Sequence, residues 1–130
     1  MTYTFTKALA PIDGGVVSMM MRTSPECVKI LDRSGELRLM NENGMTLMEI
    51  DDFNQFEGQL WWDLWPAEHK QKLIEAVSAA SRGFGATFEA MCPTAKGTVK
   101  HWRVRVVAIR GGEMNGKILA SSQDITGQTA

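Results

Sequence analysis

The segment from Thr98 to Thr126 constrains the fold more than any other part of the chain. From Lys100 to Ala108, apolar residues alternate with polar ones. A repeat of two residues is typical of a β-strand with one buried face and one solvated face. We expect the buried face to carry Trp102, Val104, Val106 and Ala108, and the solvated face to carry His101, Arg103, Arg105 and the apolar Val107.

A second strand is predicted to run back along the first. Asn115 and Gly116 suit a tight turn because both residues tolerate positive φ, and Lys117–Ser122 then supplies β-forming residues. A two-stranded ribbon is marginal in water by itself. The rest of the chain must therefore supply further strands and a cover for the apolar face.

The length and composition of the chain favour one globular domain. The chain has 130 residues, of which 44% are hydrophobic and 22% are charged. A net charge of −1 gives no support for a nucleic-acid partner, and Arg103 and Arg105 fit a solvated sheet face. The longest apolar run, Val16–Met21, is too short to span a membrane, and the N-terminus lacks the pattern of a secretory signal. We therefore expect a cytoplasmic location.

The chemistry-bearing residues point to no catalytic or metal centre. Cys27 and Cys92 do not make a disulfide framework, so we expect buried thiols in a reducing compartment. His69 and His101 lie far apart, and no metal-ligand spacing is present. Asp63 is the one candidate general base, and no nucleophile or phosphate-loop motif accompanies it. We predict no catalytic residues, no metal ligands and no enzyme activity in this chain.

Strands are predicted on both sides of a helical middle. A hairpin is expected from Cys27–Leu31 and Glu36–Met40 around a turn at Asp32–Gly35. Either Asn41 or Asn43 would cap a short helix over Gly44–Glu49, before an acidic loop over Asp51–Leu60. A strand over Ala86–Met91 and a turn over Pro93–Gly97 lead into the ribbon. This order favours an α+β fold with a five-stranded antiparallel sheet.

The longest predicted helix runs from Pro66 to Arg82. Proline is favoured at the first helical position, and Gly83 ends the helix as a C-terminal cap. One apolar stripe, which we expect to cover the sheet, carries Leu73, Ile74, Val77 and Ala80. The preceding run Trp61–Pro66 holds three tryptophans, which fit the core and, as a second interpretation, the wall of a ligand cavity.

The first 24 residues allow two interpretations. Pro11 and the pair Gly14–Gly15 argue against one continuous helix. The segment is either a flexible leader or a flanking element that packs on the sheet or on a second copy of the chain. In the second case its methionines would fill irregular gaps.

Four features together resemble PAS domains, the sensor modules of bacterial signalling proteins. They are the hairpin ILDRSGELRLMN, the run GQLWWDLWP before the long helix, the set Gly97, Thr98 and Trp102, and the terminal Asp124-Ile125-Thr126. The resemblance covers about Cys27–Thr126. It implies a sheet of strand order 2-1-5-4-3 with short helices and one long helix on one face. It also implies a flanking segment over residues 1–24, a PAS domain over residues 25–126 and an exit over residues 127–130.

The resemblance implies a sensory role. PAS domains often hold a small molecule between the sheet and the long helix, and often act as homodimers. They relay the signal to a C-terminal effector, such as the histidine kinase of a two-component system or a cyclic-dinucleotide enzyme. The alternative is a ligand-free dimerisation or protein-interaction module. The candidate pocket residues are Leu47, Trp65, Ile74, Val77, Phe88, Trp102 and Val104.

The terminal triplet is the candidate relay. The short side chains of Asp124 and Thr126 suit hydrogen bonds to the backbone where a strand ends, and Ile125 would fix the exit direction by packing. The plain alternative is a capped strand end without a relay role.

Two cofactors are disfavoured. Flavin-binding PAS domains resemble one another by an Asn-Cys-Arg-Phe-Leu-Gln run, whereas FEGQLWWDLWP in this chain contains no cysteine. Haem-binding members often place a histidine inside the long helix, near Leu73 of this chain. His69 comes only three residues after Pro66, and we expect it to be exposed.

Overall fold

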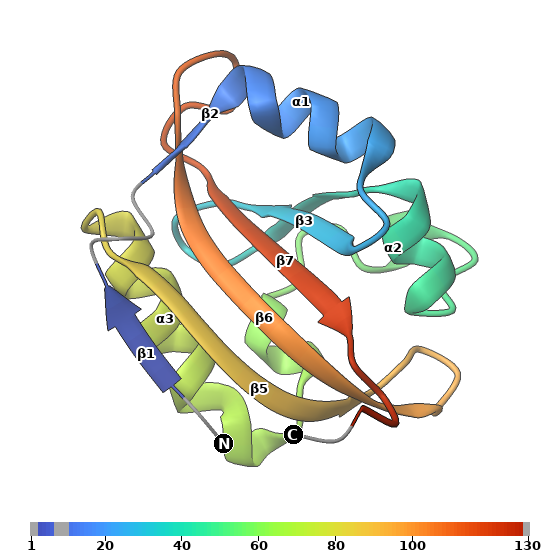
Figure 1. Ribbon diagram of the computed structural model, residues 1–130. Coiled ribbons are helices and arrows are strands. Elements are labelled where there is room, and N and C mark those ends of the chain that lie inside the picture. Colours follow the sequence, from blue (N-terminus) through green and yellow to red (C-terminus); the bar gives the residue numbers. More distant parts are fainter. Residues whose placement is uncertain (1–2, 7–10, 129–130) are drawn as a thin grey trace.

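A curved sheet with helices on both faces forms the domain (Figure 1). The computed structural model describes the backbone of residues 3–6 and all of residues 11–128. Its strands are β1 (Tyr3–Thr6), β2 (Ile12–Asp13), β3 (Cys27–Leu31), β4 (Leu37–Met40), β5 (Gly85–Pro93), β6 (Val99–Arg110) and β7 (Ile118–Asp124). Its helices are α1 (Gly14–Thr23), α2 (Glu42–Leu47) and α3 (Lys70–Ser81), with 3₁₀ turns η1 (Phe53–Gln55), η2 (Trp61–Leu64) and η3 (Ala67–His69).

The predicted ribbon is formed by β6 and β7. The two strands are antiparallel, with Trp102 opposite Asp124 and Ala108 opposite Ile118. The turn differs from the prediction, because the loop between the strands spans residues 111–117 and only Gly116 of the Asn115–Gly116 pair has positive φ. Asn115 instead accepts a hydrogen bond at Oδ1 from the backbone N–H of Gly111, at 2.7 Å. Its side chain therefore closes the loop.

The order of the sheet is β1-β5-β6-β7-β3-β4. The five strands from β4 to β5 have the predicted antiparallel order 2-1-5-4-3, and two N-terminal strands extend it. Strand β1 pairs with the outer side of β5, whereas the short β2 runs parallel to the end of β6. The PAS-like α+β fold is thus confirmed, with a mixed sheet in place of a purely antiparallel one.

The concave side of the sheet carries the larger core, which we call the inner core. Trp102 and Val104 of β6 pack there with Phe88 of β5, and each of these side chains is almost fully buried. Helix α3 supplies Leu73 and Val77 from its predicted apolar stripe. The apolar area that this stripe removes from water stabilises the packing of α3 on the sheet.

The N-terminal boundary of the long helix is a correction. The sequence predicts a helix from Pro66, but Pro66 is extended with ψ of 142° and precedes the 3₁₀ turn η3. The α-helix begins only at Lys70. Its end agrees with the prediction, since Gly83 has φ of +92° just after the C-cap Arg82. A proline suits the start of an α-helix and of a 3₁₀ turn alike, so Pro66 did not show which of the two follows it.

The convex side carries a second, smaller core, which we call the outer core. Helix α1 lies across this face (Figure 1), and Val17 packs there against Ile30 and Val107. Val107 is therefore apolar on the face that the alternation predicts to be solvated, because α1 covers that face at this point. Gly14 and Gly15 start the helix, because the Asp13 side chain accepts hydrogen bonds from the N–H groups of Gly15 and Val16.

The remaining elements follow the prediction with shifted ends. Asn41, not Asn43, caps α2, accepting from the Gly44 N–H at 3.0 Å, and α2 begins two residues before the predicted start. Strand β5 begins one residue earlier than predicted and extends to Pro93. Among the described residues, no helix has both the length and the apolar character needed to cross a membrane.

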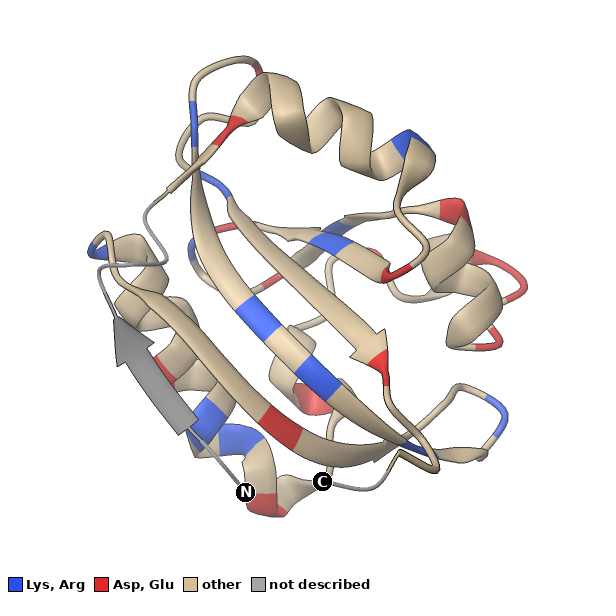
Figure 2. Cartoon of the chain, viewed as in Figure 1, with Lys and Arg blue, Asp and Glu red and all other residues tan. Residues whose placement is uncertain are grey.

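The exposed part of the convex face is sparsely charged. Figure 2 shows basic positions along β6 and an acidic position on the neighbouring β5. Arg103 and Arg105 are exposed, and Arg103 pairs with Glu89 at 3.1 Å. Isolated pairs of this kind contribute little to stability.

We predict that α1 is an integral part of the fold. Val17 is fully buried in the outer core, whereas its neighbour Val16 is 47% exposed. Val17→Ala should lower the free energy of unfolding by about 2 kcal/mol because it leaves a cavity, and Val16→Ala should change it by less than about 0.5 kcal/mol. Urea denaturation of the two variants measures both values. Equal and negligible effects would mean that α1 does not pack on the sheet.

Candidate functional site

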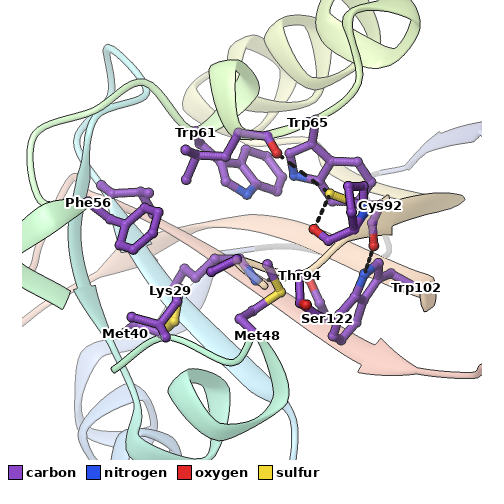
Figure 3. A pocket seen from close by; sticks show the side chains of 15 residues that line it. Lys29, Met40, Met48, Phe56, Trp61, Trp65, Cys92, Thr94, Trp102 and Ser122 are labelled. Carbon is purple, nitrogen blue, oxygen red and sulfur yellow. Dashed lines mark hydrogen bonds between the residues drawn. The ribbon is translucent and has the colours of Figure 1, made fainter. Parts of the chain in front are cut away.

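A cavity of about 210 Å³ opens between the concave side of the sheet and the segments that cover it. Strands β3 to β7 each contribute lining residues, η2 forms one wall, and the segment that follows α2 forms another (Figure 3). The lining is mostly apolar or aromatic, as is typical of small-molecule sites. It consists of Lys29, Leu37, Met40, Met48, Ile50, Phe56, Trp61, Leu64, Trp65, Cys92, Pro93, Thr94, Ala95, Trp102 and Ser122.

Trp61 and Trp65 form one wall of the cavity, which we call the tryptophan wall. The tip of the β3–β4 hairpin holds this wall in place. Trp61 donates its backbone N–H to the Gly35 carbonyl at 2.9 Å, and only 2% of its surface is exposed. Gly35 has φ of +98°, and a Cβ atom there would lie 2.2 Å from the Trp62 ring. Glycine is therefore required at this position. Trp65 packs edge to face against Trp61 and Phe88, with distances between ring centres of 6.2 Å and 5.9 Å.

Trp102 and Cys92 close the opposite end of the cavity. The Trp102 Nε1–H donates to the Cys92 carbonyl at 3.1 Å, from the neighbouring strand β5. The Cys92 thiol is buried beside the Leu64 carbonyl, and this burial raises its pKa to about 11, opposed by the positive charge of Lys29. A thiol with so high a pKa is almost entirely protonated at neutral pH, so it is a poor nucleophile.

Lys29 points into the cavity from the middle of β3. Alternation along this strand sends Cys27, Lys29 and Leu31 to the concave side and Val28 and Ile30 to the outer core. Lys29 is 5% exposed. Its ammonium donates to Ser122 Oγ at 2.9 Å and to the Cys27 carbonyl and Sγ at 3.3 Å each. We did not name Lys29 from the sequence, because both faces of β3 are buried and the period of two is hidden.

The structure brings only part of the predicted pocket set to the cavity. Trp65 and Trp102 line it. Val77, Phe88 and Val104 lie in the packed inner core, and Leu47 packs against that core from α2. Ile74 is partly buried on α3. The cavity lies toward α2 and the 51–60 loop, whereas the prediction placed it between the sheet and the long helix. Whether these residues touch a ligand stays a prediction.

His69 is a correction. We expected it to be exposed, but only 9% of its surface is accessible, and its ring packs edge to face on Trp65 at 6.2 Å. Its Nδ1 has no hydrogen-bond partner among the described residues. The ring is buried because η3 turns it toward the tryptophan wall, and it does not line the cavity. Asp63, by contrast, is half exposed and pairs with Lys70 at 3.8 Å.

The terminal triplet forms a compact junction with the start of β6. Asp124 accepts hydrogen bonds at Oδ1 from the N–H and the hydroxyl of Thr126, and Thr126 Oγ1 accepts from the His101 N–H at 3.0 Å. Ile125 is 3% exposed and donates its N–H to the His101 carbonyl at 2.8 Å. The three residues thus fasten the end of β7 to β6.

Lys100 connects this junction to the cavity. Its ammonium lies 3.5 Å from Asp124 Oδ2 and 5.8 Å from the centre of the Trp102 ring, and it donates to the Leu47 carbonyl of α2 at 2.8 Å. Burial alone would raise the pKa of Asp124, but the Thr126 hydrogen bonds and the Lys100 charge outweigh it and lower that pKa. Asp124 is therefore ionised at neutral pH.

Within the described part of the chain, no three His, Cys, Asp or Glu side chains gather closely enough to hold a metal ion. The cavity is lined mainly by apolar side chains, and Lys29, Thr94 and Ser122 supply polar groups that are suited to orienting a small molecule.

Comparisons with solved structures show the same fold. A PAS domain from Colwellia psychrerythraea is 18% identical, with a TM-score of 0.72 over 88% of this chain and 98% of that one. A domain of a sensory box sensor histidine kinase/response regulator from Geobacter sulfurreducens is 15% identical, with a TM-score of 0.68 over 85% of this chain and 92% of that one. The RpfR quorum-sensing receptor PAS domain of Cronobacter turicensis, in complex with BDSF, is 21% identical, with a TM-score of 0.62 over 80% of this chain and 97% of that one.

No curated protein sequence matches the chain. A family model described as "PAS fold" matches residues 21–130, which is most of the chain and includes the cavity and the terminal junction. The chain belongs to the PAS family.

Proposed function

We propose that this PAS domain is the sensory module of a bacterial signal-transduction protein, such as a sensor histidine kinase. It binds a small molecule in the cavity and relays the binding event through Asp124, Ile125 and Thr126 to a C-terminal effector. The observation that carries the proposal is the position of Trp102, which belongs both to the cavity and to the strand pair that ends at the terminal junction. Its ring lines the cavity, and its backbone lies opposite Asp124 in the sheet.

The cavity has the size and the lining for a small ligand. An apolar protein cavity of about 150 Å³ accepts benzene, and this one measures about 210 Å³. Four aromatic and two methionine side chains are among its fifteen lining residues, and methionine adapts readily to ligands of different shape. Among the similar structures, the Cronobacter domain is in complex with BDSF, which supports small-molecule binding by the same fold.

The relay follows from the contacts of Lys100. A ligand that moves the Trp102 ring changes the position of the ammonium that packs over it, and this ammonium pairs with Asp124. Asp124 in turn holds Thr126, whose hydroxyl bonds to the backbone of His101. A short chain of contacts thus joins the cavity to the residues where the sheet ends.

Ligand binding is testable by filling the cavity. Indole, benzyl alcohol and benzoate are suitable probes, and one of them at about five times its Kd should stabilise the fold by about 1 kcal/mol. Thermal denaturation should then shift by about 2–8 °C. Leu64→Trp places an indole in the cavity and should abolish the shift, whereas Leu39→Trp, on an exposed residue of β4, should retain it.

A wild-type protein that responds to none of these probes would contradict the ligand proposal. That result would favour the second candidate, a ligand-free PAS interaction module. Val16 and Met19 of α1 offer a contact surface for a second copy, because they are 47% and 57% exposed.

The relay predicts a change at the junction when the cavity is filled. Amide hydrogen exchange of His101 and Ile125, whose N–H groups bond across the junction, should change at saturating probe. The Ser24 amide, which bonds to Met20 at the end of α1, serves as the control and should not change. Asp124→Asn removes the charge that Lys100 contacts and should weaken the response at His101 without weakening probe binding. Unchanged exchange at both junction amides in the wild type would refute the relay.

A further inference from the structure

Lys29 gives the cavity a chemical preference. It is the one charged residue among the fifteen that line the cavity. Figure 3 shows its side chain between Trp61 on one side and Met48 on the other. We propose that the cavity selects a small organic anion, a carboxylate with an apolar body, and that the Lys29 ammonium binds the carboxylate. The proposal rests on the sensory function above and names the class of its ligand.

Lys29 lacks a counter-charge within the described residues, because it makes no ion pair with any of their carboxylates. Its three hydrogen-bond acceptors are a backbone carbonyl, a cysteine sulfur and a hydroxyl. The other lysines near the cavity differ, since Lys96 pairs with Asp51 at 3.3 Å and Lys100 with Asp124 at 3.5 Å. A buried cation without an anion is costly. A ligand carboxylate would supply the partner that the chain itself does not.

The surroundings of Lys29 favour a carboxylate over a phosphate. A phosphate site in a protein usually combines arginine forks, several cations or a set of free backbone N–H groups. The lining offers one ammonium and no arginine, which matches a single negative charge. Ser122 lies within 2.9 Å of the ammonium and places a hydroxyl beside the same spot.

The rest of the wall sets the body of the ligand. Trp61, Trp65 and Phe56 on one side and Met40 and Met48 on the other make a lining suited to an aromatic ring or a short aliphatic chain (Figure 3). The volume of about 210 Å³ is larger than that of an apolar cavity of roughly 150 Å³ that binds benzene. One ring with a carboxylate, or an aliphatic acid of similar size, fits this space.

The test compares acids with neutral molecules of the same shape. Titration calorimetry of the wild-type domain should show benzoate binding at least ten times more tightly than benzamide, and hexanoate more tightly than hexanamide. Lys29→Met keeps the length and apolar stem of the side chain and should abolish the preference for the acids. Lys96→Met, which removes an equal charge from a paired and 57% exposed lysine, should retain it.

The outcomes separate the two proposals. Equal affinity for acid and amide in the wild type, or binding of indole without binding of either acid, would overturn the carboxylate assignment and leave the sensory proposal standing. Failure of every probe, indole included, would overturn both. The wild-type comparison needs no variant, so poor folding of Lys29→Met would not remove the test. Lys29→Arg provides a second variant that keeps the charge and should keep the preference.

Discussion

The burial of Trp102 is the constraint on which the other features depend. Its ring fills the concave side of the sheet, and the one polar group of that ring is satisfied by the Cys92 carbonyl of the adjacent strand. An indole N–H without a partner in this apolar setting would be unfavourable. The bond therefore fixes how β5 and β6 lie at the place where the cavity begins. Because Trp102 also lies opposite Asp124, the same residue sets the position of the terminal junction.

The sheet carries a packed core on each face, although the convex face is left partly exposed at Arg103 and Arg105. Helix α3 and the tryptophan wall cover the concave side, but these segments leave a cavity near Lys29. Helix α1 covers part of the convex side through the outer core. The domain thus combines a sheet packed on both sides with a cavity wall that includes two adaptable methionines, Met40 and Met48.

Strong local patterns were enough to predict most of the fold. The alternation around Trp102 identified β6 and its buried face, and the stripe that includes Leu73 and Val77 identified the cover. Helix α1 was harder, because Gly14 and Gly15 look like turn residues until the cap at Asp13 is seen. Lys29 and His69 were missed for a related reason. A strand with two buried faces shows no alternation, and a histidine in a 3₁₀ turn is oriented by tertiary packing that local sequence does not encode.

The position of Trp102 is testable by the exchange rate of its indole proton, measured by NMR on the domain without added ligand. We predict that this proton exchanges at least about a hundredfold more slowly than that of the half-buried Trp62, because exchange requires local opening of the core. A Trp102 proton that exchanges as fast as a solvent-exposed indole would place the ring outside the core. The cavity, the link to Asp124 and the sensory proposal would then lose their common basis.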